Sequence, residues 1–142
     1  MSVNFFYSFG NKLHRLGIPG AALLFKFFIR VICRCAVDPR TPIGEGSFFA
    51  YGGIAVVLHR KCIIGKNVTI SQCVTVGGRA GHSRLPEIGD NVYLGAGAVI
   101  LGDIKIGNNA TIGAGSVVIH NVGEGETWAG VPARKLEKND KK

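Results

Sequence analysis

The sequence predicts an all-β protein, a single-stranded parallel β-helix preceded by a short N-terminal helical segment. Two observations lead to this class. An aliphatic residue recurs every six positions through the middle of the chain, and glycine, asparagine and aspartate recur between these residues. In addition, the 142-residue chain has 21 glycines and only 18% charged residues, which is typical of short strands joined by many tight turns.

The six-residue repeat runs from Ile43 to about Val122. Counted in sixes from Leu58, ten of eleven positions are Ile, Leu or Val, and the exception is His82. The aliphatic positions are Leu58, Ile64, Ile70, Val76, Ile88, Leu94, Ile100, Ile106, Ile112 and Val118. Six residues suit one flat strand and one corner, so three steps close a triangular coil of about eighteen residues. A helix would need a period of about 3.6 and a half-buried strand a period of about two.

A second inward position follows each aliphatic residue by four places. It is small or β-branched, because a triangular prism is narrow near its corners: Val68, Val74, Val92, Ala98, Ile104, Ala110, Ser116 and Val122. Glycine, asparagine and aspartate are suited to the corner backbone, as at residues 65–67, 89–91 and 107–109.

Residues 1–40 are predicted to form the helical segment, and residues 41–142 the β-helix with a C-terminal extension. Within the first region, residues 18–37 are apolar except for Lys26, Arg30 and Arg34, which share one stripe of a helix. Three charges disfavour a transmembrane segment. We expect an amphipathic helix that either packs on the oligomer or makes peripheral contact with an anionic membrane surface.

The net charge and the cysteine spacing limit the functions that this sequence can have. The net charge of +8 would suit nucleic acid, an anionic membrane or a phosphorylated ligand, but no basic groove with interleaved aromatic residues is visible, so we expect no nucleic-acid partner. Cys33, Cys35, Cys62 and Cys73 fit neither a zinc ribbon nor a redox pair, which predicts buried thiols in a reducing compartment. The start of the chain lacks the pattern of a secretory signal, so the expected location is the cytoplasm, with or without membrane association.

Four segments resemble the hexapeptide-repeat acyltransferases, in their serine acetyltransferase branch, and most of all the short members found in surface-polysaccharide gene clusters. These segments are Ile-Gly-Lys-Asn-Val-Thr-Ile at 64–70, Ile-Gly-Asp-Asn-Val-Tyr-Leu-Gly-Ala-Gly-Ala at 88–98, Ile-Gly-Ala-Gly-Ser-Val-Val at 112–118 and Ala-Gly-Val-Pro-Ala-Arg at 129–134. The resemblance implies a left-handed coil, a homotrimer with active sites between subunits, acetyl-CoA as cosubstrate, and direct attack by the acceptor hydroxyl.

The expected base of such a transfer is histidine. By resemblance, the family's catalytic His falls on Tyr51, its neighbouring Asp on Ala50, and its second His on Leu85. We therefore expect His59 and His82 as the catalytic candidates, with Tyr51 as a donor or an orienting group. Each histidine has a second interpretation: His59 as an outward corner residue and His82 as a solvated loop residue.

The expected cofactor groove consists of small residues. If the loop at 77–87 takes up one face of a coil, two columns form at eighteen-residue spacing: His59 with Gly77, Gly95 and Gly113, and Gly78 with Ala96 and Ala114. By resemblance, Arg134 and Lys135 meet the CoA phosphates, and Trp128 either covers the adenine or packs the end of the coil. No metal is expected, because the histidines and acids lack ligand spacing, which also disfavours zinc-dependent hydration of carbon dioxide.

These features predict an acetyl-CoA-dependent O-acetyltransferase that acts on a hydroxyl of a sugar or polysaccharide precursor. Two alternatives stay open. One is serine O-acetylation in cysteine biosynthesis, disfavoured by Ala50, by Tyr51 and by the absence from this sequence of the long helical domain typical of serine acetyltransferases. The other is a catalytically silent trimeric scaffold, disfavoured by the intact small-residue columns.

Overall fold

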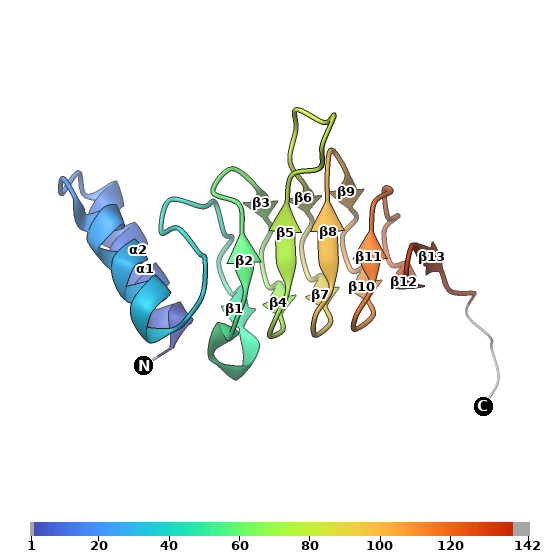
Figure 1. Ribbon diagram of the computed structural model, residues 1–142, viewed down its shortest axis with the longest axis horizontal. Helices are drawn as coiled ribbons and strands as arrows, with labels where there is room; N and C mark the ends of the chain where they lie inside the picture. The colour runs from blue at the N-terminus through green and yellow to red at the C-terminus, as the bar shows by residue number, and fades with distance from the viewer. Residues whose placement is uncertain (1, 138–142) are drawn as a thin grey trace.

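The computed structural model describes residues 2–137, so Met1 and the last residues of the predicted C-terminal extension, 138–142, lie outside the described residues. Two helices stand at the N-terminal end of a stack of short parallel strands (Figure 1). They are α1 (Val3–Arg15) and α2 (Ala21–Ile32). None of the helices in this part of the chain is long and apolar enough to span a membrane.

The strands form the three faces of a prism, and the chain visits sheets C, A and B in turn. Sheet A contains β2 (Val57–Leu58), β5 (Thr75–Gly77), β8 (Val99–Leu101) and β11 (Val117–Val118). Sheet B contains β3 (Ile63–Ile64), β6 (Glu87–Ile88) and β9 (Lys105–Ile106). Sheet C contains β1 (Phe48–Phe49), β4 (Thr69–Ile70), β7 (Tyr93–Leu94), β10 (Thr111–Ile112), β12 (Thr127–Gly130) and β13 (Ala133–Lys135). All pairs are parallel except β12 with β13.

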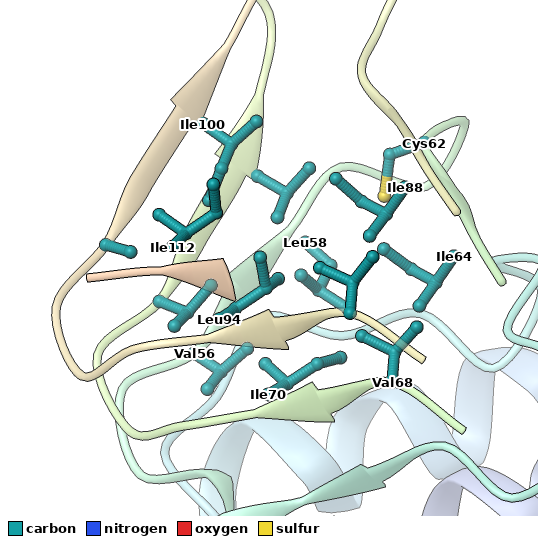
Figure 2. Packing of buried hydrophobic residues seen from close by; sticks show 14 of the residues in the cluster. Val56, Leu58, Cys62, Ile64, Val68, Ile70, Ile88, Leu94, Ile100 and Ile112 are labelled. Carbon is teal, nitrogen blue, oxygen red and sulfur yellow. The ribbon is translucent and has the colours of Figure 1, made fainter. Parts of the chain in front are cut away.

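The interior of the prism is the predicted aliphatic ladder, so this part of the prediction is confirmed. All ten aliphatic residues counted in sixes from Leu58 are at most 4% exposed, and they stack from coil to coil (Figure 2). The eight second inward positions are also buried. Full burial of one such aliphatic side chain is worth about 2 kcal/mol, so the ladder is the main stabilising element of the solenoid.

Asparagine and glycine form the corner between sheets B and C. Asn67, Asn91 and Asn109 have φ values of +53°, +54° and +59°, a left-handed conformation that asparagine tolerates better than most residues. Just before the first of them, a Cβ atom on Gly65 would lie 2.5 Å from the carbonyl oxygen of Gly89 on the next coil. The coils therefore stack too closely here for any side chain.

Residues 78–86 form a loop that projects from the corner between sheets A and B (Figure 1). Four of the nine parallel strand pairs are offset by eighteen residues, as in the pairing of Val57 with Thr75. Across the loop the offset is twenty-four, as in the pairing of Thr75 with Val99. The expectation that this loop takes up one face of a coil is therefore wrong, because the loop contributes six additional residues that leave the prism.

The helical segment differs in detail from the predicted single helix. Helix α2 ends at Ile32, and Arg34 has a φ of +54°, so Arg34 does not continue the stripe of Lys26 and Arg30. Helix α1 packs on the turn η1 (Ala50–Gly53) and on β1, whereas α2 packs mainly on α1. The two helices thus pack against each other at the N-terminal end of the solenoid (Figure 1).

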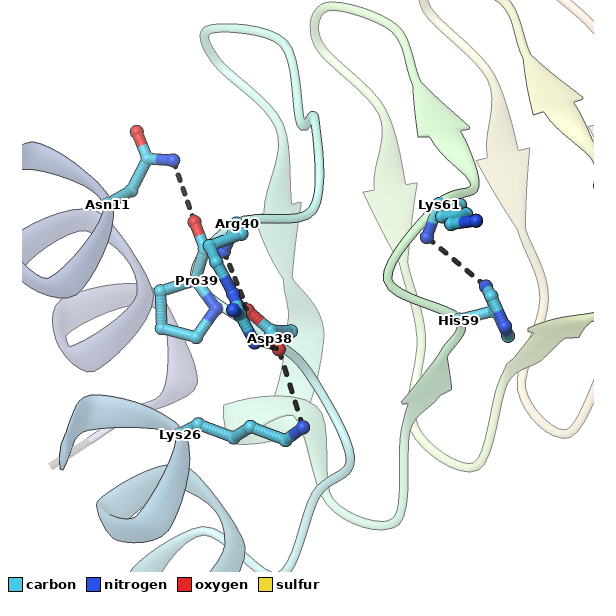
Figure 3. Close-up of polar contacts among 7 residues, drawn as sticks. All are labelled: Asn11, Lys26, Asp38, Pro39, Arg40, His59 and Lys61. Atoms are coloured by element: carbon cyan, nitrogen blue, oxygen red, sulfur yellow. Dashed lines mark hydrogen bonds and ion pairs between the residues drawn. The ribbon is translucent and has the colours of Figure 1, made fainter. Parts of the chain in front are cut away.

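A buried carboxylate, that of Asp38, joins α2 to the segment that leads into the first coil (Figure 3). The oxygens of Asp38 accept hydrogen bonds from Nε of Arg40 at 2.9 Å and Nη2 of Arg40 at 2.7 Å, and Nζ of Lys26 on α2 lies 3.4 Å away. Burial raises the pKa of Asp38, but the hydrogen bonds and charge of Arg40, together with Lys26, outweigh burial and lower that pKa to about 2.

Candidate functional site

The corner between sheets A and B brings His59 and the loop together. His59 directly follows β2, and its backbone N–H donates a 2.9 Å hydrogen bond to the carbonyl of Val76 on the next coil. On the coil after that, the N–H of Gly102 donates a 3.0 Å hydrogen bond to the carbonyl of Gly77. His59, Gly77 and Gly102 therefore occupy successive coils at this corner, which we call the AB corner.

The loop folds back over Gly102. A Cβ atom on Gly102 would lie 3.2 Å from Cβ of Arg79 and 3.8 Å from Cγ of His82. His82 is exposed, as is His59, so both imidazoles are open to solvent at the AB corner. The sequence did not predict that Arg79 and Gly102 lie beside His82 at this corner. One signal for it was present, since Gly102 lies outside the repeating glycine positions.

The corner between sheets C and A, the CA corner, carries Tyr51 and a strip of small residues. Tyr51 lies in η1, is 77% exposed and has a φ of +51°. Further along the stack, the N–H of Gly97 bonds to the carbonyl of Gln72, and the N–H of Gly115 bonds to the carbonyl of Ala96. This ladder aligns Gln72, Ala96 and Ala114 on successive coils.

The structure divides each predicted column between the two corners. Gly95 and Gly113 share the CA corner with Ala96 and Ala114, because β7 pairs with β10 in sheet C. His59, Gly77 and Gly78 belong to the AB corner. The predicted columns are therefore wrong, and the reason is the six-residue offset that the loop introduces.

The space around the glycines differs between the two corners. All 21 glycines lie within residues 2–137, and 19 of them have a positive φ or would place a Cβ atom in a tight contact. Gly95 belongs to the crowded class, with a Cβ position 2.6 Å from the backbone nitrogen of Ala114. Gly77 and Gly78 are the other two: their nearest contacts would be ordinary ones at 3.9 and 3.5 Å, and neither φ is positive. The fold does not require glycine at these positions, so the bare backbone there points to close approach of a ligand.

The predicted phosphate ligands lie in the β12–β13 hairpin at the far end of sheet C. Nζ of Lys135 lies 2.7 Å from Oε1 of Glu126, and Oε2 of the same carboxylate accepts a 2.9 Å hydrogen bond from Nε1 of Trp128. The hydrogen bond from Lys135, then that from Trp128, lowers the pKa of Glu126 to about 2. Lys135 is thus engaged within the hairpin, whereas Arg134 is exposed, and within residues 2–137 its guanidinium donates only to the carbonyl of Ala133. Trp128 packs against the core.

The thiols are partly as predicted. Cys33, Cys35 and Cys62 are buried, and burial raises the pKa of the Cys62 thiol to about 12. Cys73 is exposed, so the prediction of a buried thiol is wrong there. Within residues 2–137, no three side chains of His, Cys, Asp or Glu gather closely enough to hold a metal ion.

Comparison with known proteins identifies the class. Residues 86–120 match the family described as bacterial transferase hexapeptide (six repeats). The chain is 43% identical over 130 residues to a serine acetyltransferase of Synechocystis sp., covering 90% of this chain and 52% of that protein. It is 39% identical over 124 residues to a serine acetyltransferase of Staphylococcus epidermidis, covering 86% of this chain and 58% of that protein. The chain thus spans about half the length of the curated relatives it matches.

Solved structures of serine acetyltransferases are similar to this chain as well. The soybean serine acetyltransferase apoenzyme superposes with a TM-score of 0.83 at 38% identity, covering 94% of this chain and 56% of that chain. The Brucella abortus serine acetyltransferase in complex with coenzyme A superposes with a TM-score of 0.83 at 33% identity, covering 92% and 53%. The predicted left-handed parallel β-helix is confirmed. The chain belongs to the hexapeptide-repeat transferases, in the serine acetyltransferase branch.

Proposed function

We propose that this chain is an acetyl-CoA-dependent O-acetyltransferase. The observation that carries the proposal is the AB corner, where the open backbone of Gly77 and Gly78 lies beside two exposed histidines, His59 and His82. The relatives add support, since they are serine acetyltransferases and one solved neighbour is a complex with coenzyme A.

The chemistry requires a base, a leaving thiol and an oriented acceptor. An imidazole at the AB corner takes the proton of the acceptor hydroxyl while that oxygen attacks the thioester carbonyl. The carbon–sulfur bond then breaks, and the coenzyme A thiolate leaves with the proton that the imidazole held. The acetyl group passes directly to the acceptor oxygen, so the chain supplies proton transfer and positioning. His59 and His82 are the candidates for this base, and Tyr51 is a candidate donor.

We further propose that the site is shared between protomers of a homotrimer. The histidines and the small residues Ala96 and Ala114 lie on different corners of one prism, so a single chain does not bring them together. If the AB corner of one protomer faces the CA corner of its neighbour, the pantetheine arm lies between Gly77–Gly78 and the Ala96–Ala114 strip. Arg134, at the end of the same sheet as that strip, would then meet the phosphates. Lys135 could join it only by leaving Glu126.

The acceptor that the relatives favour is serine, since the curated relatives are serine acetyltransferases and one soybean structure is a complex with serine. A sugar hydroxyl is the second candidate. The observation that favours it is the sequence of η1, which has Ala50 and an exposed Tyr51 where the family resemblance implies an Asp and a His.

A thiol-release assay tests the proposal. The purified chain is given acetyl-CoA with L-serine in one arm and with a panel of sugar nucleotides and glycans in the other, and calorimetry measures coenzyme A binding. We expect coenzyme A to bind and an alcohol to stimulate thiol release. Binding without turnover on any acceptor would leave acetyl transfer unsupported, and absence of binding would favour a non-catalytic scaffold.

A further inference from the structure

The outer face of α2 is apolar, although it points away from the rest of the protein. Ala22 and Ile29 are buried on the inner side of the helix, against α1 and the core. On the opposite side, Leu23, Phe27 and Val31 are spaced by four residues and are 61%, 60% and 57% exposed. An amphipathic surface helix would carry polar residues on that side. We call this side, with Leu24, Lys26 and Arg30, the outer face.

The charge around the outer face has a single sign. Residues 1–37 contain Lys12, Arg15, Lys26, Arg30 and Arg34 but no Asp or Glu, so five of the eight excess positive charges of the chain lie there. The nearest acid in sequence is Asp38, which is buried and is bonded to Arg40. Within residues 2–137 these cations make one ion pair, that of Lys26 with Asp38, so Arg30 and Arg34 face solvent without an acidic partner in that part of the chain.

We propose that the outer face docks on an anionic lipid membrane, in addition to the transferase function proposed above. An apolar strip that enters the boundary between headgroups and acyl chains, with flanking cations that meet anionic headgroups, is how interfacial helices bind. A second copy of this chain fits less well. A twofold contact between two outer faces would bring like charges together, including Arg30 against its counterpart.

The position of α1 and α2 adds to the proposal. Both helices lie at one end of the solenoid, away from the loop over Gly102 (Figure 1). If the threefold axis of the proposed trimer runs along the solenoids, the three outer faces lie at the same end. Three weak contacts on one bilayer add up to much tighter binding than one. Docking there would leave the AB corner free.

Vesicle flotation tests this proposal on the full chain. The probes are vesicles of phosphatidylcholine with phosphatidylglycerol and vesicles of phosphatidylcholine alone, each at low and high salt. We expect binding to the anionic vesicles, weak binding to the neutral ones, and release by salt. We expect Phe27→Glu to weaken binding at least about tenfold and Arg30→Gln about fivefold. The matched control is Leu136→Glu, which changes a 49% exposed residue at the other end and should bind like the wild type.

Circular dichroism and the mass in solution show that each variant is folded and assembled. Equal binding of Phe27→Glu and wild type to anionic vesicles would overturn the proposal, as would equal binding to both kinds of vesicle. If wild type binds no vesicle but Phe27→Glu reduces its mass in solution, the outer face is an interface between copies and the membrane proposal fails.

Discussion

The backbone N–H of Lys61 donates a 3.1 Å hydrogen bond to Nδ1 of His59 (Figure 3). A neutral imidazole that accepts at Nδ1 carries its proton on Nε2, so in this arrangement the exposed nitrogen is a donor. His59 can therefore donate a hydrogen bond to an oxygen as it stands. To accept a proton at Nε2, its proton must first move to Nδ1, which requires the Lys61 contact to open.

Replacement of His59 separates proton transfer at Nε2 from the turn contact that Nδ1 makes with Lys61. We expect His59→Ala to lower kcat by about 10²–10⁴-fold with coenzyme A affinity retained. In His59→Asn, the amide oxygen can still accept from Lys61 while Nε2 is gone, so we expect the same loss of kcat without a loss of thermal stability. Steady-state kinetics and thermal melts check this. Near-wild-type kcat in His59→Asn would assign His59 to the turn alone.

A second prediction concerns His82 over Gly102. We expect His82→Ala to lower kcat by about 10²-fold or more, with the unfolding midpoint unchanged, because its side chain is exposed. His14→Ala, on exposed α1 outside the coil, is the matched control and should keep full activity. If His82→Ala and His14→Ala have the same rate, His82 has no part in transfer.

The glycines of the two corners predict opposite outcomes. Gly78→Ala places a methyl group in ordinary contact with Leu85, so we expect stability within about 1 kcal/mol of wild type. Because the methyl group occupies space proposed for the pantetheine arm, coenzyme A affinity should fall, as calorimetry would show. Gly95→Ala forces a Cβ atom against the backbone of Ala114 and should cost about 3 kcal/mol or more in urea unfolding. Unchanged coenzyme A affinity in Gly78→Ala would remove Gly78 from the groove.

A shared site predicts complementation between defective chains. His59→Ala damages the AB corner, and Ala114→Trp, at an exposed position, blocks the CA corner. Each variant alone should be inactive. Co-expressed in equal amounts, they should regain about a quarter of wild-type activity, because about a quarter of the contacts join two intact corners. Activity no higher than that of the separate variants would indicate a site within one chain.

Asp38 predicts a pH dependence of stability. Its pKa is about 2 in the folded chain, below its ordinary value of 3.8, so its ion pairs stabilise the fold fully above that ordinary value. This contribution, about 2 kcal/mol, is lost as the pH falls from about 4 to about 2. We expect urea unfolding of Asp38→Asn to show lower stability at neutral pH and a difference from wild type that shrinks in acid. A difference that does not change between neutral pH and pH 2 would contradict this role.

The six-residue period was sufficient to predict the interior, because each coil must bury one aliphatic residue per face. It was not sufficient to predict which residues share a corner. That depends on whether residues 78–86 lie on a face or leave it, and periodicity does not distinguish the two when the addition is itself six residues long. The six-residue period also did not predict helix α1, which lies outside the repeat. A helix of this length depends on tertiary contacts. Here the side-chain amide of Asn4 donates a hydrogen bond to the carbonyl of Phe49 and accepts one from its backbone N–H, forty-five positions away in sequence.

The excursion between Gly77 and Glu87 has a consequence for how such a protein can diversify. Strand β6 pairs with β3 although residues 78–86, between it and β5, leave the prism. Insertions or deletions at this point would reshape the rim of the proposed active site, and we expect every downstream coil to keep the same residues pointing inward. Selectivity for the acceptor could then be exchanged by grafting this segment alone, with the scaffold inherited intact.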